Sequence, residues 1–399
     1  MAGSEISDKK GSKLNILQTL RKHGNVSRID LTRLTGLSRA TVSVSIAELI
    51  ESKLVRETTD RMATKGRPAT YLELVPYAGT IIGADYDNSR WTLCAFDLSG
   101  NIIKKASIPA ASSSAEDVLH SLLIQLKPFI GSLEQPPIPI LGLGVPGLVD
   151  SDYQTIRSAP ELGWYHIDVG GILRKELGWT SVTINRHRAR GLAECRYGSG
   201  QDYHHQIYLG VGSGIAAGIY IDRQLMSGST GGAGELGHTT ILPDGPLCHC
   251  GNHGCLQVLS SAPTIEQQFR KRIRQGEASV LLNNEDSDLQ MVRAEDIGKA
   301  ADLGDELSGA IIKQAASYLG IAMANLVNLF NPEAIILGGR MPHASKLFVD
   351  TAASVMRQRA SSSLGAVTAV KVNALHDIGG PLGAANFAFD QKAHISLFQ

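Results

Sequence analysis

Three cysteines form the densest group of metal-ligating residues in this sequence. Cys248, Cys250 and Cys255 stand within eight residues, in the segment GELGHTTILPDGPLCHCGNHGCLQ. Gly251 and Gly254 allow the loop to wrap closely around a small centre. Three thiolates and one imidazole make a closed tetrahedral zinc site with no open position for a substrate. The spacing therefore predicts a structural Zn²⁺ ion.

The fourth ligand of this site has three candidates, which are His238, His249 and His253. His249 lies between two of the cysteines, where its ring would strain to reach inward. We favour His238, which the preceding strand and loop would bring to the cluster. Loss of zinc is expected to unfold the loop and to displace Glu235 and Gln257, which flank it.

The first 75 residues predict a small helical head. Apolar residues at helical spacing indicate three short helices in residues 13–55, with Gly24 and Gly36 as stop signals. Ser38 is a candidate N-cap of the third helix. Two short helices, a turn and a third amphipathic helix form a helix-turn-helix pattern.

The residues that could contact DNA lie on the third helix and on the segment after it. We expect the outer face of that helix to carry Ser38, Arg39, Thr41, Ser43 and Ser45, which suit phosphate and base-edge contacts. Residues 54–76 indicate two strands around a basic wing tip, where Lys65 and Arg67 could enter a minor groove.

The distribution of charge agrees with a head that meets a polyanion. Residues 1–75 hold 13 lysines and arginines against 8 acidic residues, whereas the remainder holds 25 against 30. The alternative interpretation of the head is a three-helix module that binds another protein.

From residue 79 onward, strand-like apolar runs alternate with helical ones, which predicts an α/β fold with parallel sheets. Glycines recur at the strand ends, where ligands bind in open α/β sheets. The segment is long for one core, so we expect two lobes with a cleft. We place the DNA-binding domain at 1–78, a small lobe at 79–194 plus 383–399, and a large lobe with the zinc loop at 195–382.

The bulk composition is that of a soluble globular protein. Of the 399 residues, 43% are hydrophobic and 19% are charged. No apolar run approaches the roughly 20 residues of a membrane span, and the N-terminus lacks the apolar core of a signal peptide. Five cysteines are too few for a disulfide scaffold. We therefore expect a cytoplasmic protein without a membrane partner.

Several further segments accompany the cysteine loop in a fixed order: GLGVPGLVD (142–150), PELGW (160–164), residues 210–238 and NLFNPEAIILGG (328–339). In this order they resemble the ROK family of repressors and sugar kinases, over residues 12–399. The resemblance implies an actin-like, two-lobed sugar-kinase body, each lobe built on a ribonuclease-H-like sheet. A winged helix-turn-helix before the body is the pattern of the repressors in that family.

The same resemblance implies ligand sets. It supports His238 as the zinc ligand beside the three cysteines. The family's sugar contacts fall here on Asn185, Glu235, His238 and Gln257, the last in place of a glutamate. A loop that usually supplies an asparagine to the sugar carries Glu161, which we keep as a candidate ligand residue together with Arg186.

Two departures from the family argue against phosphoryl transfer, so we expect no enzymatic activity. The catalytic aspartate of the kinases is replaced by Arg186, and a guanidinium cannot accept the proton of a sugar hydroxyl. The family's Gly-Gly phosphate turn corresponds to Asp87 and Asn88, which add bulk and negative charge. Glycine-rich loops at 210–214 and 338–339 persist and could serve as tight turns alone.

The sequence thus predicts a transcriptional regulator, most simply a repressor of carbohydrate metabolism genes. It would bind operator DNA and a sugar or sugar derivative, and self-associate as a dimer or tetramer. The alternatives are an active ATP-dependent sugar kinase with a DNA-binding head and a regulator controlled by a protein partner. Arg186 and Arg188 could bind a phosphate or carboxylate of the effector. Alternatively, Arg186 could pair with Glu161 or another local carboxylate and thereby shape a neutral-sugar pocket or close it.

Overall fold

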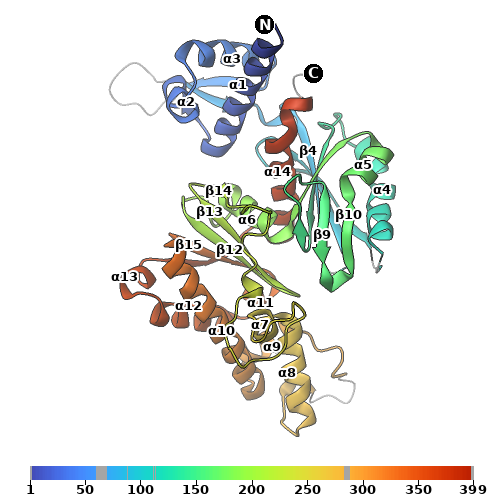
Figure 1. Cartoon of the computed structure of the whole chain (residues 1–399), viewed down its shortest axis with the longest axis vertical. Helices are drawn as coiled ribbons and strands as arrows, with labels where there is room; N and C mark the ends of the chain where they lie inside the picture. Colours follow the sequence, from blue (N-terminus) through green and yellow to red (C-terminus); the bar gives the residue numbers. More distant parts are fainter. Residues whose placement is uncertain are drawn as a thin grey trace. The chain divides into compact units, whose positions relative to one another are not determined.

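The computed structural model describes residues 2–59, 70–87, 89–110, 112, 114–282 and 288–396. The chain forms two compact units, one of residues 1–186 and 380–399 and one of residues 187–379 (Figure 1). Lys65 and Arg67 of the predicted wing tip and Asn88 of the predicted phosphate turn lie outside the described residues. The domain boundaries predicted from the sequence stay a prediction.

The first unit begins with a winged helix-turn-helix. Its elements are α1 (Ala2–His23), β1 (Val26–Ser27), α2 (Arg28–Thr35), α3 (Arg39–Glu51), β2 (Val55–Thr59) and β3 (Thr70–Leu74). The strands form an antiparallel sheet in the order β1-β3-β2. Gly36 ends α2 at a φ of 70°, and the Ser38 hydroxyl caps α3 by accepting the Thr41 N–H at 3.1 Å. These two residues fix the angle at which α3 leaves the turn.

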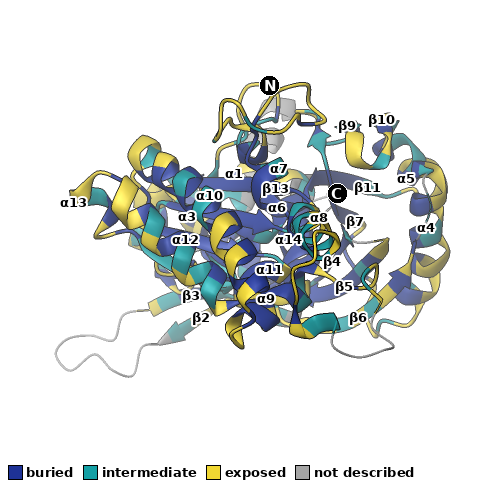
Figure 2. Ribbon diagram, turned by 90° about the horizontal axis from the view of Figure 1, so that it is seen from below, coloured by how far each residue is buried: buried dark blue, intermediate teal, exposed yellow. Residues whose placement is uncertain are grey.

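The body of the first unit is a five-stranded sheet in the order β11-β7-β4-β5-β6. Its strands are β4 (Thr80–Asp87), β5 (Arg90–Asp97), β6 (Ile102–Pro109), β7 (Ile140–Val145) and β11 (Thr180–Asn185). A smaller sheet holds β8 (Leu148–Val149), β9 (Thr155–Ala159) and β10 (Trp164–Asp168). The helices are α4 (Ala115–Gly131), α5 (Val169–Leu177) and α14 (Gly379–Ser396). In Figure 2, β4, β5 and β7 are buried, whereas the outer turns of α4 and α5 are exposed.

This sheet is mixed, whereas the sequence pattern predicted parallel strands. β4, β7 and β11 are parallel, but β4, β5 and β6 are antiparallel neighbours. Only two positions separate Asp87 from Arg90, which is far too short for the crossover that parallel strands need. The prediction missed this hairpin because apolar runs reveal strands without their direction.

Helix α14 lies directly on this sheet. A Cβ atom at Gly83 would lie 2.0 Å from the Pro381 carbonyl oxygen, and one at Gly142 would lie 2.1 Å from that of Ala384. Any larger residue at either of these two positions would push the helix away. The strand glycines are therefore explained by close packing of the C-terminal helix.

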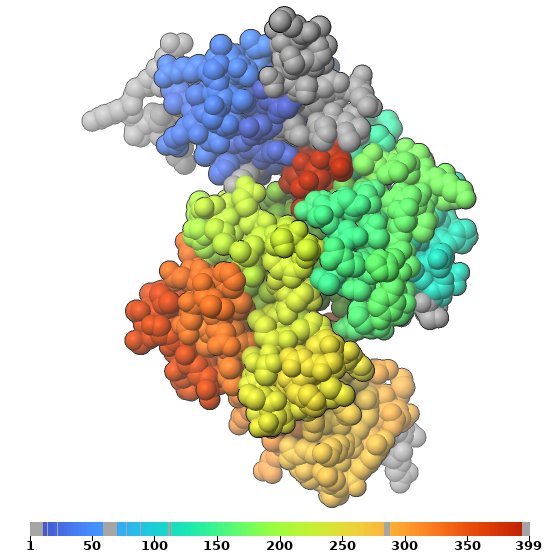
Figure 3. Space-filling model, viewed as in Figure 1, coloured from blue at the N-terminus to red at the C-terminus, as the bar shows by residue number. Residues whose placement is uncertain are grey.

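The same helix also holds the head, a contact that the sequence did not predict. Arg21 of α1 is 1% exposed at its side chain, donates a hydrogen bond to the Asn386 side chain and pairs with Asp390 at 3.4 Å. Its guanidinium lies 4.3 Å from the ring centroid of Phe389. In Figure 3 the end of α14, in red, borders the head, in blue. A buried cation thus ties the head to the C-terminal helix.

The second unit is built on a mixed sheet in the order β14-β13-β12-β15-β16. The strands are β12 (Gln206–Val211), β13 (Ile215–Ile221), β14 (Gln224–Leu225), β15 (Ala334–Gly338) and β16 (Ala369–Val372). The helices are α6 (Arg186–Tyr197), which begins at the boundary, α7 (Gln257–Ser260), α8 (Ala262–Arg274), α9 (Ala294–Asp302), α10 (Glu306–Phe330), α11 (Arg340–Ala344), α12 (Lys346–Arg359) and α13 (Ser362–Gly365).

Helix α10 is the one described helix that is long and apolar enough to cross a membrane, which the sequence analysis did not anticipate. Its most apolar window is 61% buried inside the protein, and its apolar side chains belong to the core of the second unit. A helix that is apolar on most sides is typical of a core position.

Candidate functional site

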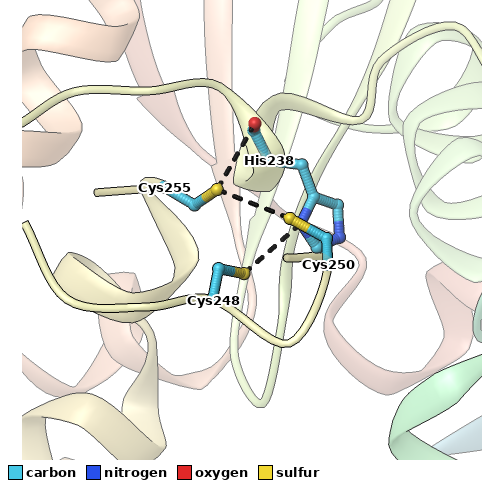
Figure 4. Close-up of side chains that lie close together, drawn as sticks. All are labelled: His238, Cys248, Cys250 and Cys255. Carbon is cyan, nitrogen blue, oxygen red and sulfur yellow. Dashed lines mark hydrogen bonds between the residues drawn. The ribbon is translucent and has the colours of Figure 1, made fainter. Parts of the chain in front are cut away.

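The structure brings together the four residues predicted to bind zinc. One ligand atom from each of His238, Cys248, Cys250 and Cys255 lies within 4.8 Å of the others (Figure 4). His238 ends a short 3₁₀ turn, η3 (Leu236–His238), and the cysteines follow on the loop that leads to α7. His253 is turned elsewhere, with Nδ1 3.1 Å from the Gly245 carbonyl oxygen. Among the three candidate imidazoles, the cluster therefore contains that of His238.

The distances fit a tetrahedral zinc centre. The Sγ atoms of Cys250 and Cys255 are 3.7 Å apart, and Nδ1 of His238 is 3.7 Å from Sγ of Cys248. Zinc–sulfur bonds of about 2.3 Å separate two tetrahedral ligands by about 3.8 Å. The spacing among these side chains is therefore that of ligands around one small ion.

The thiols of this cluster differ in acidity. A hydrogen bond from the Asn252 backbone N–H, together with hydrogen bonds from neighbouring side chains of the cluster, lowers the pKa of Cys250 to about 7. Burial raises the pKa of Cys255 to about 12. A bound divalent cation deprotonates its thiol ligands outright. The cluster can therefore supply thiolates to a cation even at the buried position.

Glycine is required in the loop that holds the cysteines. Gly254 has a φ of 64°, and a Cβ atom there would lie 1.6 Å from the Leu242 carbonyl oxygen. Gly251 has a φ of 90°, which L residues with side chains rarely adopt. These two positions let the chain fold back on itself around the ligands, as the sequence predicted.

Two predicted sugar ligands of the second unit lie beside this cluster. Glu235 directly precedes η3, and Gln257 is the first residue of α7. A Cβ atom at Gly237 would lie 3.1 Å from Oε1 of Gln257 and 2.3 Å from the Ile215 carbonyl oxygen. Gln257 therefore lies against the backbone of the turn that carries Glu235 and His238.

Arg188 holds the loop that leads to Glu235. Its side chain is buried and donates hydrogen bonds to the carbonyl oxygens of Gly231 and of Ala233, the latter at 2.5 Å. The hydroxyl of Tyr220 donates in turn to the Arg188 carbonyl oxygen. Burial raises the pKa of Tyr220 well above its usual range, so this hydroxyl keeps its proton. The guanidinium that we considered as an effector anchor thus contacts backbone of its own unit.

Three of the predicted residues of the first unit, Asn185, Arg186 and Asp87, lie at the ends of parallel strands. Asn185 ends β11, and its side-chain amide donates to the Gly147 carbonyl oxygen at 2.9 Å. Arg186 follows, is 7% exposed at its side chain and pairs with Asp87 at 2.7 Å between Nη1 and Oδ1. Asp87 ends β4 and is 31% exposed. Glu161 lies exposed on the 3₁₀ turn η2 (Pro160–Leu162).

The ion pair of Arg186 and Asp87 joins the two positions that were predicted from the sequence to depart from the kinase pattern. The strand order puts β7 between β4 and β11, and the parallel arrangement brings the ends of these strands to one edge of the sheet. Of the partners considered for Arg186, the structure shows the local carboxylate Asp87. The sequence did not predict this contact, because Arg186 and Asp87 are 99 residues apart.

The outer face of α3 differs in part from the predicted one. Arg39 and Ser43 are exposed, and Thr41 is half-buried with its hydroxyl 2.9 Å from that of Ser38. Ser45 is 4% exposed, so its assignment to the outer face was wrong. It lies on the helical face of Val42 and Leu49, which packs into the head. The preceding residue, Val44, lies on the outer face instead and is 51% exposed.

The profile of the ROK family matches residues 81–391. The chain belongs to the ROK family. A second profile, described as a winged helix-turn-helix DNA-binding domain, matches residues 11–56, which are the helices of the head.

The chain is similar to both regulators and kinases of the ROK family. It is 30% identical to the xylose repressor of Caldicellulosiruptor bescii over 384 residues, 96% of each chain. The crystal structure of a ROK family transcriptional regulator, described as a homolog of the Escherichia coli MLC protein, superposes with a TM-score of 0.82. It has 29% identity and covers 98% of each chain. A ROK family glucokinase from Streptomyces griseus, in complex with glucose and AMPPNP, has a TM-score of 0.70 and 27% identity.

The glucokinase matches only part of this chain. The match covers 99% of the kinase but only 78% of this chain. The body therefore contains a complete ROK kinase fold, and the predicted α/β body with an N-terminal winged helix-turn-helix is confirmed.

Proposed function

We propose that this ROK protein is a transcriptional repressor of sugar metabolism genes whose kinase-like body binds a sugar and transfers no phosphate. The observation that carries the proposal is the ion pair between Arg186 and Asp87. A ROK kinase requires a proton acceptor at the first position and a small phosphate turn at the second. A buried guanidinium bound to a carboxylate provides neither.

The head binds operator DNA in this proposal. Arg39 and Ser43 on the exposed face of α3 enter the major groove, and Ser38 and Thr41 lie at the start of the helix, where N-terminal residues reach base edges and phosphates. Lys65 and Arg67, which lie outside the described residues, add wing contacts. Since palindromic operators require paired heads, the protein acts as a dimer or tetramer, on DNA in the cytoplasm.

The body senses the effector. Similarity to the xylose repressor supports a sugar, and Asn185, Glu235, His238 and Gln257 are the proposed hydrogen-bonding residues, with Glu161 as a further contact. The carboxylate of Asp87 occupies Arg186, which favours a neutral sugar over a sugar phosphate. The sugar changes DNA affinity only to the extent that it binds the two conformations of the protein differently.

Zinc has a structural role in this proposal. His238, Cys248, Cys250 and Cys255 would hold it, and four protein ligands would close its coordination. When bound, the ion supplies a cross-link between the turn at His238 and the cysteine loop. It would thereby keep Glu235 and Gln257 in place for the sugar.

Two measurements on the full chain test the proposal. A coupled ADP-release assay with glucose, xylose, N-acetylglucosamine and their phosphates should show no turnover. Titration calorimetry with the same panel should show binding of a neutral sugar, and that sugar should change operator affinity. Clear turnover would make the protein a sugar kinase with a DNA-binding head. Operator binding that responds to no sugar would instead favour control by a protein partner.

The role of the head is tested separately. Removal of residues 1–75 should abolish operator binding and leave sugar binding by the body unchanged. The variant Arg67→Ala should weaken binding to all sequences and reduce its salt dependence, because one phosphate contact is lost. Operator binding by the truncated chain would contradict the assignment.

A further inference from the structure

Val44 is an exposed apolar residue in the middle of the helix that faces DNA. Val42, Ser45, Ile46 and Leu49 of α3 are buried in the head. The opposite face is formed by six exposed residues, Arg39, Ala40, Ser43, Val44, Ala47 and Glu51. Val44 is 51% exposed, although a β-branched apolar residue gains nothing from water there.

The charge of this face suits a nucleic acid. The first turn of α3 contains no acidic residue, and it begins with the exposed Arg39. Further along the helix, Glu48 is neutralised by Lys13, with Nζ and Oε2 2.9 Å apart. The exposed carboxylate of this face, Glu51, ends α3 about two turns after Val44, so the earlier turns of the helix, which begin with Arg39, present no exposed carboxylate to phosphates.

The groove offers one apolar group to such a side chain. In the major groove of B-DNA, the base pairs present hydrogen-bond donors and acceptors and the C5-methyl group of thymine. Of the neighbours of Val44 on this face, Ala40 and Ala47 end at Cβ and Ser43 ends in a hydroxyl, so the two methyl groups of Val44 are the apolar groups that reach furthest among them. A donor or acceptor on a base edge would lose its hydrogen bonds to water if valine covered it. Contact between valine and a thymine methyl group instead removes apolar surface from water and stabilises the complex.

We infer that Val44 is a specificity-determining residue that selects thymine at one position in each operator half-site, through contact with its 5-methyl group. The inference rests on the proposed DNA-binding function and specifies both the base that is recognised and the methyl group that Val44 contacts. The recognition helix thus reads one position by apolar contact, whereas Arg39 and Ser43 act through hydrogen bonds and charge.

Ile29 provides a matched control within the same head. It is 72% exposed and lies in the first turn of α2, the helix that precedes the turn of the motif. In helix-turn-helix proteins this first helix crosses the phosphate backbone and the second one enters the groove. Ile29 is therefore an exposed apolar residue that should not touch a base.

The test uses the full-length protein and DNA that differs by single methyl groups. An operator is first selected from a random pool, and each thymine is then replaced in turn by deoxyuridine, which lacks only the methyl group. Affinities are measured by fluorescence anisotropy at one salt concentration. One replacement per half-site should weaken binding by about fourfold, the factor that corresponds to burial of one methyl group.

The variants link that effect to Val44. V44A should bind the thymine and deoxyuridine operators equally at this position, V44T should keep part of the discrimination, and I29A should keep all of it. Because Val44 is exposed, V44A should fold normally, which zinc content and melting temperature can verify. The inference is wrong if V44A retains the deoxyuridine effect at every thymine, or if the selected half-site has no thymine. A chain that enriches no sequence at all overturns the proposed DNA binding, and this inference with it.

Discussion

Two polar regions of the body differ in the groups that they bring together. At the strand ends of the first unit, Arg186 and Asp87 form an ion pair. In the second unit, the metal cluster keeps a complete ligand set within 4.8 Å. The proposed function assigns no chemistry to the first region and gives the second a structural role in sugar binding.

The two regions also differ in how they are held together. Arg186 and Asp87 stabilise each other through one charged pair between side chains. The cluster depends on a ligand set and on glycines at positive φ, such as Gly254, and Arg188 fixes the adjoining loop through backbone carbonyls. Substitutions should therefore affect the second region more strongly and the first region more locally.

The largest effect is expected from the metal ligands. His238→Ala should lose zinc, measured by inductively coupled plasma mass spectrometry, and should lower the melting temperature by about 10 °C or more, because metal binding contributes directly to folding. His253→Ala, which removes an imidazole that lies outside the cluster, should retain both zinc and stability. Equal zinc content in the two variants would show that His238 is no ligand.

A smaller effect is expected at the ion pair of the first unit. A double-mutant cycle with Arg186→Met and Asp87→Asn should give a coupling energy of about 2 kcal/mol, because the guanidinium is nearly buried. The three tryptophans, Trp91, Trp164 and Trp179, all belong to this unit, so their fluorescence in urea follows its unfolding.

An exposed pair of the same residue types is the control for this cycle. Arg157 and Asp150 are 39% and 29% exposed, and their coupling should lie below about 1 kcal/mol. If the two cycles gave the same coupling energy, burial of Arg186 would not strengthen its pair. The interpretation that Arg186 and Asp87 stabilise each other in a buried ion pair would then be wrong.

Arg188 should affect the sugar more than the stability of the protein. Arg188→Lys keeps the charge but cannot reach two carbonyls with the planar geometry of a guanidinium. We expect sugar affinity to fall about tenfold by calorimetry, while zinc content and operator binding without sugar stay unchanged. Arg196→Lys, in the last turn of the same helix, is the control and should bind sugar normally. Unaltered affinity in Arg188→Lys would mean that this loop does not position the sugar contacts.

The sequence alone predicted those features that depend on nearby residues. The zinc ligands lie within 18 positions, and Gly36 and Ser38 mark the turn of the head directly. A helix or a loop motif is specified by residues close together in the sequence, so the same pattern predicts the same local structure wherever it occurs. These predictions could therefore be made without knowledge of how the strands are ordered.

The missed features depend on long-range packing or on exact helical phase. The partners of Arg186 and of Arg21 are 99 and 369 positions away, and only the order of the strands and the course of α14 bring them together. Ser45 was assigned to the wrong face because one residue along a helix turns a side chain by about 100°, so Ser45 is buried although Val44 beside it is exposed. A sequence pattern resolves which helix has an apolar face more reliably than which residue stands at its edge.

The smallest expected effect is at Gln257, where the resemblance to ROK proteins implies a glutamate. Gln257 lies against the backbone of Gly237, so a glutamate of the same length should fit there. A carboxylate accepts a hydrogen bond from a sugar hydroxyl more strongly than an amide does, by about 1 kcal/mol. Gln257→Glu should therefore tighten sugar binding by about fivefold in calorimetry, whereas Gln257→Ala should weaken it. If Gln257→Glu binds more tightly and still releases no ADP, affinity and chemistry depend on different regions of the body. Weaker binding by Gln257→Glu would mean that the amide is suited to a different ligand from that of the kinases.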